Sequence, residues 1–142
     1  VVETEFLRAE AAERGFAVAG SAESHYNKAI TASILYWGGT QADADAYLAQ
    51  PAVAYTTAAG NWKEKIATQK WIALYNRPYE GWTELRRLDF PKITPPVNAK
   101  SGFPTRFSYP ANEQTLNGAN YTAAASAIGG DVVTTKLFWD KN

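Results

Sequence analysis

One stretch near the middle of the chain constrains the fold more than any other. Residues 66–90 read IATQKWIALYNRPYEGWTELRRLDF, a helical pattern interrupted once by a proline. Aromatic side chains lie on one side of this pattern, and glutamate and arginine lie on the other. Because Pro78 has no amide hydrogen to donate to the carbonyl of Leu74, the sequence predicts a break in the helix within residues 75–79. We therefore expect a mainly α-helical protein.

Composition narrows the functional classes. Among the 142 residues, fourteen basic and fourteen acidic side chains cancel, so nothing predicts binding to nucleic acid. There is no cysteine and no apolar run long enough to cross a membrane. Methionine is also absent, so we expect a processed or excised piece of a longer protein. Aromatic residues make up 13 %, which suits either a large helical core or a sugar-stacking platform.

Helix start and stop signals divide the first 60 residues. A helical pattern over residues 2–14 ends at a glycine, and Ser21 can cap a second helix over residues 22–37. Thr40 with Asp43 resembles a capping box that opens a short third helix. The second helix has Ala22, Tyr26 and Ala29, which is the small–aromatic–small spacing of the second helix of a tetratricopeptide-like hairpin, and the first helix fits this motif less well.

These signals predict three parts. We expect a tetratricopeptide-like hairpin at residues 1–37, a second helical pair at 40–90 and a loop-rich cap at 91–142. Within the cap, residues 105–109 are expected to form a short strand. The whole chain, residues 1–142, is expected to be the carboxy-terminal fragment of a larger α-superhelical fold.

The aromatic residues divide into a predicted core and a candidate site. The residues expected in the core are Phe6, Tyr26, Trp37, Trp71, Leu74 and Trp82. Tyr55 and Trp62 lie at or beside the loop of residues 51–61, where an exposed ring can stack on the apolar face of a sugar. A ring folded back onto the following helix is the alternative for both residues.

Nothing in the sequence predicts catalysis, a metal site or a cofactor. His25, the only histidine, lies among polar residues and is expected on the solvated surface. Asp43 should serve a helix N-terminus rather than bind a metal. Glu80 and Glu84 share a helical face with Arg87, and an ion-pair ladder is favoured over a glycosidase carboxylate pair. We therefore do not expect an enzyme.

Several motifs are similar to those of one known family. The matching segments are EFLRAEAA at residues 5–12, YNKAI at 26–30, YLAQP at 47–51, IATQKWIAL at 66–74, GWTELRR at 81–87 and PTRFSYP at 104–110. In order and spacing they resemble the carboxy-terminal region of the SusD/RagB family of nutrient-binding lipoproteins.

This resemblance implies helical hairpins that support a more irregular ligand face. It also implies a non-catalytic protein that captures oligosaccharides at the extracellular face of the outer membrane and delivers them to a SusC-like TonB-dependent transporter. Membrane association would come only from a lipid anchor upstream of these residues. The family's ligand loops lie largely outside this region, so no ligand residue can be carried over. A peptide- or protein-binding tetratricopeptide-type module remains the alternative, and a hydrolase is disfavoured.

Overall fold

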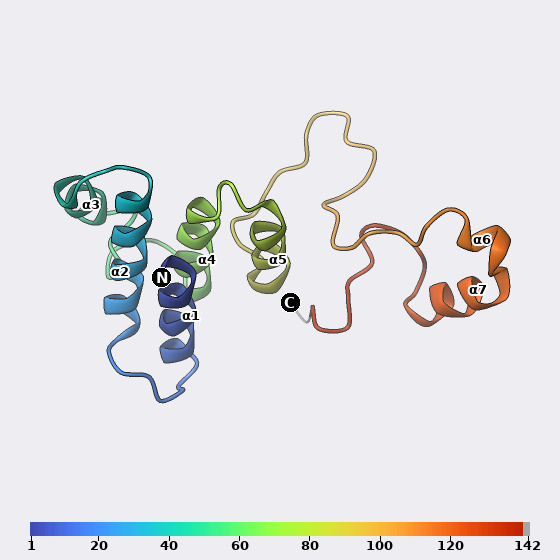
Figure 1. Cartoon of the computed structure of the whole chain (residues 1–142), viewed down its shortest axis with the longest axis horizontal. Coiled ribbons are helices and arrows are strands. Elements are labelled where there is room, and N and C mark those ends of the chain that lie inside the picture. The colour runs from blue at the N-terminus through green and yellow to red at the C-terminus, as the bar shows by residue number, and fades with distance from the viewer. Residues whose placement is uncertain (141–142) are drawn as a thin grey trace. The chain divides into compact units, whose positions relative to one another are not determined.

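A computed structural model describes residues 1–140, which form seven helices and, within that range, no strand (Figure 1). The prediction of a mainly α-helical fold is confirmed. The chain divides into two compact units, Val1–Pro91 and Lys92–Asn142, and each is described by itself. The predicted cap at 91–142 extends into residues 141–142, which lie outside the described residues.

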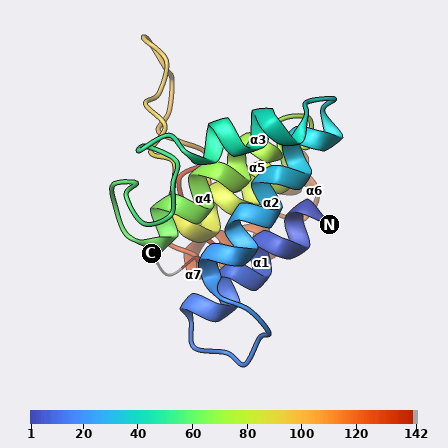
Figure 2. The same cartoon turned by 90° about the vertical axis from the view of Figure 1, so that its left-hand side faces the viewer.

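The first unit contains five helices. They are α1 (Val2–Glu13), α2 (Ala22–Tyr36), α3 (Gln41–Leu48), α4 (Trp62–Ala73) and α5 (Pro78–Leu88). Helices α1 and α2 pack side by side as a hairpin, and α4 packs against both of them and against α5 (Figure 2). Residues 40–90 thus hold three helices, so their description as a helical pair is too simple. The boundaries predicted for the three parts of the chain stay predictions.

The predicted helix boundaries are confirmed in detail. The amide of Ser24 donates to Ser21 Oγ at 3.1 Å, which caps α2. Before α3, Thr40 and Asp43 exchange both hydrogen bonds of a capping box. Gly38, which follows α2, has a φ of +91°, a left-handed conformation that glycine adopts without strain.

The break at Pro78 is also confirmed. Helix α4 ends at Ala73, and α5 begins with Pro78 at its first position. The amide of Arg77 donates to the carbonyl oxygen of Leu74 at 2.8 Å, so that carbonyl has a partner even though Pro78 cannot supply one. Proline at the first position of a helix costs no hydrogen bond, because an amide there has no intrahelical acceptor.

The core of the first unit lies where α1, α2 and α4 meet. Phe6 and Tyr26 pack edge to face at 6.3 Å between ring centroids, and both are buried. The hydroxyl of Tyr26 donates to the carbonyl oxygen of Val53 at 2.7 Å, which fixes the loop before α4 to the core. Leu74 is buried as predicted.

The burial predicted for the tryptophans is wrong. Trp37 is 51 % exposed, Trp71 is 39 % exposed, and Trp82 is only partly buried. Helical periodicity shows which side of a helix is apolar, but it does not show whether another element covers that side. Within the first unit, neighbouring elements cover the apolar sides of α2 and α4 only partly at the ends of these helices.

The second unit is held mainly by polar contacts. Its helices are α6 (Glu113–Leu116) and α7 (Gly118–Ala127). Arg106 forms a buried ion pair of 2.7 Å with Asp131, which also accepts from the amide of Tyr109 and the hydroxyl of Tyr121. The predicted strand at 105–109 is wrong. The amides of Thr105 and Arg106 both donate to the carbonyl of Val133, a convergent contact that no strand ladder contains.

Candidate functional site

Tyr55, the first residue of the predicted platform, is anchored by its neighbours. Its hydroxyl donates to Glu13 Oε1 at 2.5 Å, and its ring packs edge to face on Tyr26 at 5.0 Å between centroids. Lys65 Nζ lies 5.4 Å from the ring centroid. Burial, together with the hydrogen bond to Glu13, raises the pKa of the Tyr55 phenol. Tyr55 is therefore tied to α1 and to the core.

Trp62, the second residue of this pair, is the first residue of α4 and packs partly against the core. The guanidinium carbon of Arg14 lies 5.2 Å from its ring centroid, and Lys63 Nζ lies 6.0 Å away. Cations at these distances interact favourably with an indole. Both predicted rings thus have polar neighbours that also suit sugar hydroxyls, and their role as a sugar platform stays a prediction.

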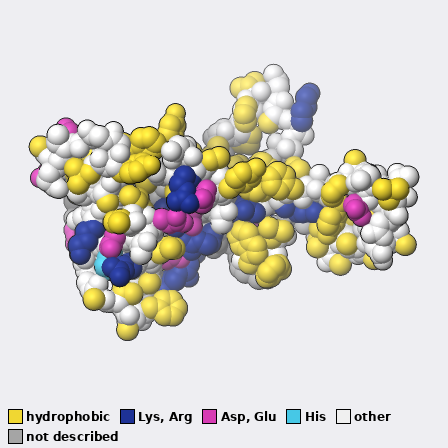
Figure 3. Space-filling model, in the orientation of Figure 1, with side chains coloured by type: hydrophobic (Ala, Val, Ile, Leu, Met, Phe, Trp, Pro, Cys, Tyr) yellow, Lys and Arg dark blue, Asp and Glu magenta, His cyan; other side chains and the backbone are white. Residues whose placement is uncertain are grey.

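A more exposed group of rings lies where α2 and α4 end. We call Tyr36, Trp37 and Tyr75 the ring cluster. Tyr36 is 74 % exposed and Tyr75 is 86 % exposed. Trp37 lies between them, with its ring centroid 5.4 Å from that of Tyr36 and 6.4 Å from that of Tyr75, both edge to face. Figure 3 shows hydrophobic side chains gathered over this part of the unit.

Sequence reasoning missed the ring cluster because Trp37 falls on the apolar stripe of α2. The sequence feature that could have revealed the ring cluster is the position of its rings at helix ends. Trp37 directly precedes the glycine pair that ends its helix, and Tyr75 lies in the break before Pro78. At both of these helix ends the rings are exposed.

An apolar hollow of about 360 Å³ adjoins the ring cluster, and Trp37 lines it together with Ile34 and Ile72. The polar groups of its lining include Gln69, whose Oε1 accepts from the Tyr47 hydroxyl at 3.0 Å. Small-molecule sites typically combine an apolar concave surface with a few such polar groups. The hollow and the ring cluster together form an exposed apolar surface of the first unit.

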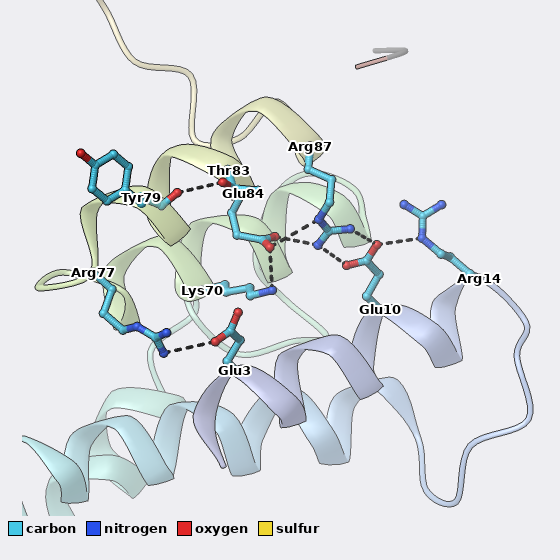
Figure 4. A network of polar contacts seen from close by, with 9 residues as sticks. All are labelled: Glu3, Glu10, Arg14, Lys70, Arg77, Tyr79, Thr83, Glu84 and Arg87. Carbon is cyan, nitrogen blue, oxygen red and sulfur yellow. Dashed lines mark hydrogen bonds and ion pairs between the residues drawn. The ribbon is translucent and has the colours of Figure 1, made fainter. Parts of the chain in front are cut away.

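The carboxylates of α1 and α5 belong to a charge network rather than to a reactive site (Figure 4). Arg87 binds both oxygens of Glu10, at 2.5 and 2.6 Å, and also Glu84 at 2.6 Å. Lys70 Nζ lies 2.9 Å from the other oxygen of Glu84, and Arg14 binds Glu10. The predicted pairing of Glu84 with Arg87 is confirmed, and the network joins α1, α4 and α5.

These ion pairs keep Glu10 and Arg87 in their charged forms, which makes both residues unsuited to proton transfer. Burial alone would raise the pKa of Glu10, but its hydrogen bonds with Arg87 and Arg14 outweigh burial and lower the pKa. Burial alone would lower the pKa of Arg87, but Glu10 and Glu84 raise it. A general acid needs a proton that it can lose and regain near the working pH. Glu10 and Arg87 are both locked in their charged forms.

The remaining acidic candidates also have structural roles. Glu80 pairs with Arg77 at 2.5 Å on the exposed side of α5, outside the network. Asp43 caps α3, as predicted.

Residues 1–140 contain no cluster of three His, Asp or Glu side chains that could hold a metal ion. Within the same range, no helix has both the length and the hydrophobicity that crossing a bilayer requires.

The prediction that His25 is solvated is wrong. The residue is 2 % exposed, and both ring nitrogens contact oxygen atoms. One partner is Glu5 on α1, twenty residues earlier in the sequence. Local sequence around His25 is polar, but the partner comes from the packing of α1 against α2.

Comparisons with known proteins point in one direction. A family model, SusD-like, described as starch-binding and associating with the outer membrane, matches residues 1–110. A solved structure described as a Bacteroidetes SusD-like protein is 34 % identical, with a TM-score of 0.85. One described as a chitin-binding protein is 38 % identical, with a TM-score of 0.81. A chitin-binding SusD homolog from Flavobacterium johnsoniae is 29 % identical, with a TM-score of 0.80.

These similarities span nearly the whole chain but only part of each relative. Each of the three structures covers 99 % of this chain, while the chain covers 30 %, 32 % and 36 % of their respective lengths. The chain therefore spans about a third of the length of the structures that it matches. No curated protein sequence matches it.

Proposed function

The chain belongs to the SusD-like family, and we propose that it is a non-catalytic, glycan-binding part of a cell-surface nutrient-binding protein. The observation that carries this proposal is the match of a starch-binding, outer-membrane family model to residues 1–110. Two solved relatives described as chitin-binding, at 38 % and 29 % identity, add support for a glycan as ligand. We further propose lipid anchoring at the outer face of the outer membrane and delivery of the glycan to a SusC-like TonB-dependent transporter.

Within this chain, we propose that the ring cluster contributes to glycan contact. Its three rings are exposed, and a pyranose presents an apolar face that packs against an aromatic ring. Each stacked ring contributes on the order of 0.5–1.5 kcal/mol. Two or three rings alone therefore give about millimolar affinity at best. Tyr55 and Trp62 remain a second proposed platform, in which the cations beside Trp62 would face the sugar hydroxyls.

Titration with chitin and starch oligosaccharides, followed by tryptophan fluorescence, tests the proposal. If the ring cluster binds, Trp37→Ala should weaken binding roughly twofold to tenfold, while Trp62→Ala leaves it unchanged. The opposite pattern would assign binding to Tyr55 and Trp62. Turnover of any oligosaccharide would contradict the non-catalytic role, and micromolar affinity would require a site with more contacts than stacked rings.

The apolar hollow favours a second candidate function, the binding of a peptide by a tetratricopeptide-type module. Its lining includes aliphatic side chains such as Ile34 and Ile72, which suit an apolar peptide side chain better than a sugar. Ile72→Ala separates the two functions. It should weaken the binding of an apolar peptide and leave oligosaccharide binding at the ring cluster unchanged.

A further inference from the structure

The two ring nitrogens of His25 join three parts of the α1–α2 hairpin. Nδ1 lies 2.5 Å from Oε2 of Glu5 on α1. Nε2 lies 2.6 Å from the carbonyl oxygen of Ala19, in the link between the two helices. The histidine itself is in the first turn of α2 and is almost completely buried.

The chemistry of the two partners fixes the number of protons on this pair. A carbonyl oxygen only accepts hydrogen bonds, so Nε2 must carry a hydrogen to bind Ala19. In the neutral ring, Nδ1 would then present a lone pair to Glu5, whose carboxylate is also an acceptor. Two acceptors repel each other at 2.5 Å, so a proton must lie between Nδ1 and Oε2. An imidazole nitrogen is more basic than a carboxylate oxygen, so that proton lies on the ring, and the resulting hydrogen bond with His25 lowers the pKa of Glu5.

We infer that His25 is a proton-dependent latch that, as an imidazolium, holds residues 17–20 against the hairpin and, once neutral, releases them. The neutral ring has one N–H hydrogen, but two acceptors face it, the carboxylate of Glu5 and the carbonyl oxygen of Ala19. A hydrogen bond to a charged carboxylate is about twice as strong as one to a neutral carbonyl. The hydrogen therefore stays on Nδ1 with Glu5, and the contact of Nε2 with Ala19 is lost.

Among the described residues, the link has a single hydrogen bond to hold it. Of the hydrogen bonds described for residues 1–140, only the one from His25 Nε2 reaches residues 17–20. The link also passes very close to the ring. A Cβ added at Gly20, whose φ is +97°, would lie 3.1 Å from Nε2 and 3.0 Å from Ser24 Oγ. Contact with His25 therefore sets the path of the link.

The surrounding charges make Glu5 the group that keeps the ring protonated. On α1, Arg8 lies 3.1 Å from the other oxygen of Glu5, and on α2 the charge of Lys28 also acts on this carboxylate. The positive charges of Arg8 and Lys28 repel a positively charged ring, whereas the negative charge of Glu5 attracts it. Within the link, the partner Ala19 contributes only an uncharged carbonyl.

NMR of the 142-residue chain across a pH series that spans both protonation states of an imidazole tests the latch. The ring nitrogen signals of His25 count its protons, and backbone order parameters report the link. At low pH we expect two ring protons and order parameters for residues 17–20 near 0.85, the value of rigid backbone. As the ring loses a proton, these order parameters should fall below about 0.6.

Glu5→Gln is the matched control. The glutamine amide can donate to Nδ1, so a neutral ring keeps its hydrogen on Nε2 and its contact with Ala19. The link should then stay ordered across the whole pH range. Gly20→Ala should displace the link at every pH while circular dichroism shows the helices intact, which keeps a test available if Glu5→Gln does not fold. A singly protonated ring with an ordered link at low pH, or wild-type pH dependence in Glu5→Gln, would overturn the latch.

Discussion

Lys70 and Glu84 carry the largest effect that we expect from a single side chain. Lys70 is 1 % exposed, and Glu84 Oε1 lies 2.9 Å from its ammonium group. Glu84→Gln keeps the size of the side chain but leaves Lys70 buried without its counter-charge. Breaking one partner of a buried ion pair typically costs about 3–5 kcal/mol, because the remaining charge has lost its hydration. Urea unfolding should therefore show a much lower midpoint for this variant.

Glu80→Gln provides the control for that measurement. Glu80 lies on the same helix and also pairs with an arginine, Arg77, but this pair is exposed to solvent. Exposed ion pairs contribute little to stability. We expect an unfolding midpoint close to that of the unchanged chain. Equal effects of the two substitutions would show that burial of the network does not determine its contribution.

Individual side-chain environments were the hardest feature to predict from the sequence. Phe6 and Tyr26 were placed correctly in the core because helical periodicity determines the inward side of α1 and α2. His25 was not, because its partner Glu5 becomes a neighbour only through the register of the hairpin. Of the candidate site, the sequence indicated Tyr55 and Trp62 but missed the ring cluster, whose exposure depends on what packs against the helix ends.

Whole elements were predicted better, because their boundaries depend on local chemistry. Ser21, Thr40 and Pro78 each mark the start of a helix through a hydrogen bond that their own residue type makes or cannot make. The strand predicted at 105–109 failed for the opposite reason. A strand needs a partner, and the segment instead converges on a single carbonyl, that of Val133.

The capping box of α3 gives a prediction at the scale of one helix. Thr40→Ala removes the hydroxyl that accepts from the amide of Asp43 at 3.2 Å, and it leaves that amide without its partner. Loss of such a cap costs about 1 kcal/mol. Thermal unfolding should show a lower midpoint for Thr40→Ala than for Thr56→Ala, an exposed threonine in the loop before α4. Equal midpoints would mean that the cap does not stabilise the folded chain.

At the scale of the whole molecule, the two units differ in what stabilises them. Every buried hydrophobic residue described, from Phe6 to Leu88, belongs to the first unit. The buried residues described in the second unit are Arg106 and Asp140, both charged. Burial of apolar surface is the main favourable contribution to folding, at roughly 25 cal/mol per Å². The second unit therefore depends on a few polar contacts centred on Asp131.

This difference predicts that the second unit opens before the first. Native-state hydrogen exchange followed by mass spectrometry should show amides of α7 exchanging at least about tenfold faster than those of α2, because regions with few buried apolar contacts open at lower free energy. Arg106→Ala, which removes the ion pair with Asp131, should increase exchange in α7 and leave α2 unchanged, since α2 rests on the separate core around Phe6 and Tyr26. Equal protection of α2 and α7 in the unchanged chain would show that the polar contacts around Asp131 stabilise their unit as strongly as the apolar core stabilises the first.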